Sequence, residues 1–204
     1  MSDQTNRVNI EGLVAHIAAC VPTADRPGDR ATLAVLRRAV GRRPGEVVEA
    51  CRVVDPFLPL RVSRREEWAA YVTATIMALH PLHARKTDGR RSAGFGRSLR
   101  RIRFRDLEED VGVERRFIAL LSADGEQMVV HLRGLVVLLH DRAVEEPLDF
   151  IQLYRDLLDW DREDRRVQRD WAAGFWAEES ERSHGGASGG PDSPVAAAAS
   201  PKEV

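Results

Sequence analysis

The side chains best able to do chemistry in this chain are arginines crowded into one segment. Seven arginines lie between positions 90 and 105, and residues 85–105 carry nine positive charges against one negative charge. A guanidinium group donates through a planar fork and stays charged, which suits the oxygen atoms of phosphate groups. The segment therefore predicts binding of nucleic acid. The alternative is a solvated arginine face in a chain that prefers arginine, because Lys86 and Lys202 are the only lysines.

The charge is polarised along the sequence. Residues 1–105 hold 20 basic and 10 acidic side chains, whereas residues 106–204 hold 11 basic and 22 acidic ones. A local concentration of one sign attracts and holds phosphate-bearing partners. Few carboxylates lie near the arginines in the sequence, so we expect the basic side chains to be free of neutralising partners.

The arginines around position 100 fit an amphipathic helix. At about 100° per residue, Phe95, Leu99 and Ile102 share one side. The opposite side carries Arg97, Arg100 and Arg101. These three are predicted to bind nucleic acid together with Arg90 and Arg91 of the preceding loop.

We find no residue pattern for catalysis, a cofactor or a metal ion. Gly94-Phe95-Gly96 is not a GxGxxG fingerprint, and no GxxxxGK[ST] sequence occurs. A proline between His80 and His83 excludes the regular spacing of a helical zinc site, so both are predicted to be ordinary histidines at a helix end. The acidic residues 108–110 are interpreted as a solvated turn or a neutralising patch, because adjacent side chains diverge on a helix. The chain is predicted to be a binding subunit and not an enzyme.

Helical periodicity recurs along the chain, and no alternating strand pattern is convincing. About nine helices with short connections predict an all-α fold in two packed helical lobes. The expected helices span about residues 9–20, 29–40, 47–51, 63–79, 95–104, 117–121, 126–141, 150–158 and 164–179. The fourth begins with a capping box at Ser63 and Glu66.

The predicted organisation has five parts. They are a flexible N-terminus (1–6), an N-terminal lobe (about 7–84), a basic loop (85–94), a C-terminal lobe (about 95–182) and a disordered tail (183–204). The tail is too poor in apolar residues to offset its ordering entropy. No apolar run is long enough to span a membrane, and the first residues do not resemble a signal peptide. We therefore expect a cytoplasmic protein.

The tryptophans lie on apolar helical faces and are predicted to be core residues instead of base-stacking platforms. Trp176 is the exception, because it points about 140° away from Trp171 on the same helix. Either it docks against another helix of the chain, or it docks against a neighbouring subunit.

Five strings in sequence order resemble the CasB family, the small subunits of the type I-E CRISPR surveillance complex called Cascade. They are Gly94–Arg101, Glu114–Leu121, His131–Leu135, Leu148–Trp160 and Arg169–Trp176. Trp68 and His80-Pro81 fit the family upstream. The resemblance covers residues 60–178 well and the first 60 residues only by helix content.

The resemblance implies an all-helical subunit with no activity or cofactor of its own. It further implies a pair of copies beside the repeated backbone subunits that hold the guide RNA, with contacts to guide, target and the displaced single-stranded DNA. By position, Arg97, Arg100 and Arg101 match the basic helix of the family. Arg115 and Arg116 match its paired arginines, and Arg133 matches a basic position in the following helix.

Other interpretations remain open for these positions. Arg115 or Arg116 could pair with Glu114 or Asp110 at a helix end, and Arg133 could lie between the lobes. The competing function is that of a helical adaptor in another assembly, whose basic face binds an acidic protein partner.

Overall fold

The computed structural model describes residues 7–84, 94–103, 107–142 and 146–185, with the side chains of all these except residues 103, 107–111 and 178–185. Within these ranges the chain forms nine α-helices, one short 3-10 helix and no strand, which confirms the predicted all-α class. The helices are α1 (Ile10–Ala19), α2 (Arg30–Arg38), α3 (Val48–Val54), the 3-10 helix (Asp55–Phe57), α4 (Arg64–Leu79), α5 (Phe95–Arg103), α6 (Leu107–Ser122), α7 (Gly125–Arg142), α8 (Phe150–Leu158) and α9 (Arg166–Gly185).

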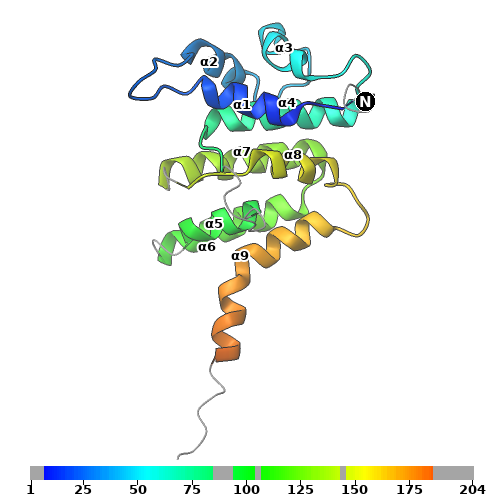
Figure 1. Ribbon diagram of the computed structural model, residues 1–204. Coiled ribbons are helices and arrows are strands. Elements are labelled where there is room, and N and C mark those ends of the chain that lie inside the picture. Colours follow the sequence, from blue (N-terminus) through cyan, green and yellow to red (C-terminus); the bar gives the residue numbers. More distant parts are fainter. Residues whose placement is uncertain (1–6, 85–93, 104–106, 143–145, 186–204) are drawn as a thin grey trace, which may run out of the picture.

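The helices stack in layers (Figure 1). Helices α1 to α4 form one end of the molecule, α7 and α8 form the middle, and α5, α6 and the first part of α9 form the other end. The last part of α9 projects away from the stack. The basic helix α5 therefore lies in the layer farthest from the N-terminal helices.

Helix α4 joins the layers. The backbone N–H of Ser63 donates to the Glu66 carboxylate at 3.1 Å, and the Ser63 hydroxyl accepts from the Glu66 N–H at 3.2 Å, which is the predicted capping box. Every residue from Ala69 to Ala78 is buried, because α1 and α2 pack on this helix from one side and α7 and α8 from the other. A helix that is buried all round belongs to the core and not to the surface.

The two lobes share one continuous apolar core. The segment around Leu148 lies against the end of the N-terminal lobe, where the Leu148 N–H donates to the Leu82 carbonyl and the Ala84 N–H donates to the Leu148 carbonyl, both at 2.9 Å. Arg65 of α4 also reaches Asp161, beyond α8, at 3.0 Å. The helices before the basic loop and those after it are therefore consecutive in the sequence, but they pack together around one shared core.

Helix α9 is longer than predicted. We expected it to end near Glu179 and the tail to begin at Ser183, but the helical backbone continues to Gly185. The added residues, 180–185, hold one glutamate and one arginine among two serines, a histidine and a glycine, so neither an apolar face nor helix propensity predicts the extension. Residues 186–204 of the predicted tail, and residues 85–93 of the basic loop, lie outside the described ranges. Among the described helices, none is both long and apolar enough to cross a membrane.

Candidate nucleic-acid interface

Helix α5 has the two faces that the sequence predicts. Phe95, Leu99 and Ile102 are 6%, 0% and 1% exposed and pack into the core. Arg97 and Arg101 lie on the exposed side, and Arg100 is half-buried. The helix thus offers guanidinium groups to solvent from a backbone that its apolar side chains fix in place.

A close crossing with α9 sets the position of α5. A Cβ atom at Gly96 would lie 1.9 Å from the Trp171 carbonyl oxygen, and a Cβ atom at Gly174 would lie 3.2 Å from the Arg97 amide nitrogen. Only glycine at position 96 allows the two backbones to approach this closely. Gly94 and Gly96 match no phosphate-binding fingerprint. The structure shows instead that Gly96 is needed for the packing of α5 against α9.

Arg101 is not free of carboxylate partners, contrary to the expectation for this face. Its Nη1 donates to Glu146 Oε2 at 2.6 Å. The Arg101 side chain remains 64% exposed, whereas that of Glu146 is 10% exposed. Burial raises the pKa of the Glu146 carboxyl, and the nearby Arg101 charge only partly opposes this shift. Glu146 lies 45 residues away in the sequence, so local charge counting could not reveal the pair.

The α6–α7 hairpin carries the other predicted arginines. Arg115 and Arg116 on α6 and Arg133 on α7 are all exposed, so Arg133 is not buried between the lobes. At a rise of about 1.5 Å per residue, Arg115 lies about 10 Å before the end of α6 and Arg133 about 12 Å after the start of α7. The hairpin therefore holds these arginines at nearly the same level along its axis.

Trp176 docks against the same chain, as the first of the two interpretations predicted. Its Nε1–H donates to Glu114 Oε1 at 3.0 Å, and its ring lies 5.7 Å from that of Phe117. The contact joins α9 to α6 one residue before the paired arginines. Trp160 and Trp171 are each 1% exposed, which confirms that they are core residues and leaves them no face for a nucleic-acid base.

Several arginines outside the predicted set tie the fold together. Arg37 donates to the Ala78 carbonyl at 2.8 Å, Arg43 lies 3.1 Å from Glu126, and Arg65 pairs with Asp161. Sequence patterns did not indicate these partners, because each is far away along the chain. Arg90 and Arg91, by contrast, lie outside the described residues, so their prediction stands without a structural account.

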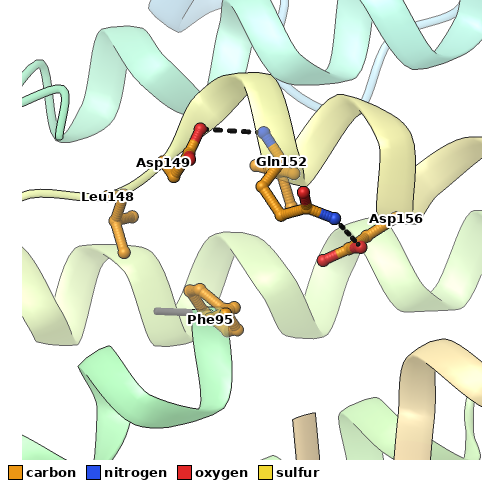
Figure 2. Close-up of a pocket in the computed structure, with 7 residues that line it drawn as sticks. Phe95, Leu148, Asp149, Gln152 and Asp156 are labelled. Carbon is orange, nitrogen blue, oxygen red and sulfur yellow. Dashed lines mark hydrogen bonds between the residues drawn. The ribbon is translucent and has the colours of Figure 1, made fainter. Parts of the chain in front are cut away.

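A small cavity lies between the start of α5 and the start of α8 (Figure 2). Phe95 and Leu148 line it together with Asp149, Gln152 and Asp156 of the α8 region. Its volume of about 10 Å³ holds about one water molecule and excludes a nucleotide. Asp156 accepts from Gln152 Nε2 at 2.8 Å and from Trp171 Nε1 at 2.7 Å, and burial raises its pKa to about 6. The cavity is therefore a packing feature that joins α8 to α9 and α5.

No group of three or more potential ligands for a metal ion occurs in the part of the chain that the structure describes. His80, predicted to be an ordinary residue at a helix end, is buried and contacts the Glu146 carbonyl and the His140 ring. The chemistry that the described surface side chains offer is that of guanidinium groups, which can donate to phosphate oxygens.

The described residues form an all-helical fold with exposed arginines on a basic helix and on a neighbouring hairpin. Comparison with known proteins gives the family: the model for the CRISPR-associated protein Cse2 matches residues 32–176. A curated Cse2 protein of Thermus thermophilus is 36% identical over 147 residues, which are 72% of this chain and 79% of the relative. The chain belongs to the Cse2 family of CRISPR-associated proteins, also called CasB, and the resemblance seen in the sequence is confirmed.

Solved structures agree with this assignment. CasB from Thermus thermophilus is 29% identical, with a TM-score of 0.61 over 82% of this chain and 97% of that one. A chain of a CRISPR RNA-guided surveillance complex is 27% identical, with a TM-score of 0.66 over 86% of this chain and 97% of that one. The residues matched by the family model include α5, the α6–α7 hairpin and the first part of α9.

Proposed function

We propose that this Cse2-family small subunit of a CRISPR surveillance complex binds the phosphate backbone of nucleic acid without reading its sequence. The observation that carries the proposal is the exposure of arginines on α5 and at one level of the α6–α7 hairpin. The proposed contacts are Arg90, Arg91, Arg97, Arg100, Arg101, Arg115, Arg116 and Arg133. The subunit would stabilise the displaced non-target strand of the R-loop and help to hold guide RNA and target.

The physical requirements of R-loop formation support this role. The exchange of one duplex for another is nearly balanced, so modest contacts to the extruded strand can favour it. Those contacts must be indifferent to sequence, which phosphate contacts are. Burial of Trp160 and Trp171 removes them as stacking platforms, so binding is mainly electrostatic. Contacts to three to five phosphates predict that log K falls against log salt with a slope of roughly −2 to −3.5.

The proposed partners follow from the same assignment. The subunit acts in a type I-E Cascade complex in the cytoplasm, beside the repeated backbone subunits and a second copy of itself. It has no catalytic activity and needs no cofactor or metal ion. Incubation of the protein with labelled single strands and magnesium or manganese should leave the strands intact.

The test replaces three exposed arginines, Arg97, Arg115 and Arg116, by glutamate. The change should abolish retention on a single-stranded DNA column and flatten the salt dependence, with an unchanged helical circular dichroism spectrum. Arg52→Glu is the matched control, because Arg52 is exposed on α3 at the other end of the stack. Unchanged retention of the triple variant refutes the assigned surface.

A second measurement separates this function from that of an adaptor. The untagged protein should co-purify with guide RNA and the other complex subunits at low salt. Capture of an acidic protein without RNA would favour the adaptor instead.

A further inference from the structure

We infer that Glu146 is an internal counter-ion that competes with nucleic-acid phosphate for Arg101. The inference rests on the proposed function and adds to it a regulatory contact within the interface. It starts from the unequal exposure of the two side chains, since the carboxylate is buried and the guanidinium group is largely open to solvent. Phosphate can therefore reach Arg101 from outside, while Glu146 holds it from inside.

Glu146 is fixed in place at two points. Its carboxylate accepts from Arg101 Nη1, and its backbone carbonyl oxygen lies 2.6 Å from Nε2 of His80, which is completely buried at the end of α4. The backbone of Glu146 is therefore held in the interior, which limits how far the carboxylate can follow Arg101 outward. If Arg101 turns toward a phosphate, the pair must break.

His80 and Ser98, which lie near Glu146, do not supply a positive charge that could neutralise the carboxylate in place of Arg101. His80 Nε2 faces a carbonyl oxygen and must carry the proton, so its Nδ1 is the acceptor toward His140 Nδ1 at 3.4 Å. Burial also lowers the pKa of His80, which favours the neutral form of that ring. Ser98 of α5 is the other polar neighbour of the carboxylate, and it is uncharged.

Breaking the pair leaves a buried carboxylate without its cation, which is costly unless the group takes up a proton. Burial already raises the pKa of Glu146, and departure of Arg101 removes the charge that opposes this shift. The nucleic-acid complex therefore favours the protonated form of Glu146 more than the free subunit does. By linkage, affinity for nucleic acid increases as the pH falls, and binding takes up protons.

The test compares Glu146→Gln with wild type in binding to a labelled single strand. The amide keeps the shape of the side chain but removes its charge, so Arg101 can turn to a phosphate without leaving a buried negative charge behind. At about 0.1 M salt and about pH 8 this should raise affinity about fivefold with the salt slope unchanged, because the same phosphates are contacted and only the cost of breaking the pair is removed. The advantage over wild type should shrink as the pH falls from about 8 to about 5.5, because protonation of Glu146 then releases Arg101 in the wild type as well.

Two controls isolate the effect. Glu126→Gln removes the same charge from an exposed pair with Arg43, and it should leave the pH dependence as in wild type. Arg101→Gln should bind single strands more weakly than wild type at acidic pH. The double variant Arg101→Gln, Glu146→Gln should have the same affinity as Arg101→Gln alone. Calorimetry in buffers of different ionisation enthalpy should show proton uptake on binding by wild type and less uptake by Glu146→Gln.

The outcomes distinguish the two proposals. Equal or weaker binding by a folded Glu146→Gln variant, or binding by wild type without proton uptake, overturns the counter-ion role and leaves the proposed function standing. If Glu146→Gln does not fold, the pH dependence of wild type against Arg101→Gln decides, and identical profiles overturn the inference. Failure of wild type to bind any nucleic acid overturns both.

Discussion

A single methyl group at position 96 should separate the basic helix from α9. In Gly96→Ala the new Cβ atom would lie 1.9 Å from the backbone carbonyl oxygen of Trp171, which cannot rotate away as the end of a side chain would. The helices must move apart, and the buried residues Phe95 and Leu99 must lose contacts with the core. Overpacking of this kind costs about 3 kcal/mol, which lowers Tm by roughly 6–12 °C for a chain of this size.

Thermal and urea denaturation of Gly96→Ala and Gly134→Ala would measure this effect. Gly134 lies on the exposed face of α7, where an added Cβ atom meets nothing within 4 Å. Alanine there should stabilise the protein by about 0.5–1 kcal/mol through helix propensity alone. If the alanine variant at position 96 is as stable as wild type, the reasoning about the α5–α9 crossing is wrong.

Two further predictions concern stability. Because burial lowers the pKa of His80 in the folded state, the unfolded chain takes up this proton first, and the contribution of His80 to the free energy of unfolding should decrease as the pH falls below about 6.5. Urea denaturation at about pH 7.5 and about pH 5.5 checks this, and His80→Gln should show a smaller decrease than wild type. Trp176→Phe keeps an aromatic ring but removes the hydrogen bond to Glu114, which should cost about 1–2 kcal/mol in urea denaturation. A loss of the same size in a Trp176→Phe, Glu114→Ala double variant as in Glu114→Ala alone supports the direct contact, whereas additive losses contradict it.

Local rules predicted much of the fold and the chemistry of the basic face. The apolar positions Phe95, Leu99 and Ile102 are buried because helical geometry places them on one side, and Ser63 and Glu66 form their capping box because both lie within one turn. The angle between Trp171 and Trp176 was also enough to show that Trp176 needed a separate partner.

The rest depends on contacts between distant parts of the chain. The partner of Arg101 lies beyond two helices, and nothing in the sequence around Glu146 marks it as buried. The role of Gly96 depends on how closely α9 crosses α5, which tertiary packing decides. The end of α9 was misplaced because its last residues, 180–185, carry no apolar periodicity that could mark them as helical.

The burial of α4 on all sides has a consequence for how the molecule behaves as a whole. Residues 69–78 of α4 are covered by α1 and α2 and also by α7 and α8. Removing either pair of helices would therefore expose apolar surface on α4. Separation of α7 and α8 from the N-terminal helices would expose the apolar side chains of α4 to water. We therefore expect the subunit to melt as one cooperative unit, so that the proposed binding of nucleic acid to one face would also stabilise helices that it does not touch.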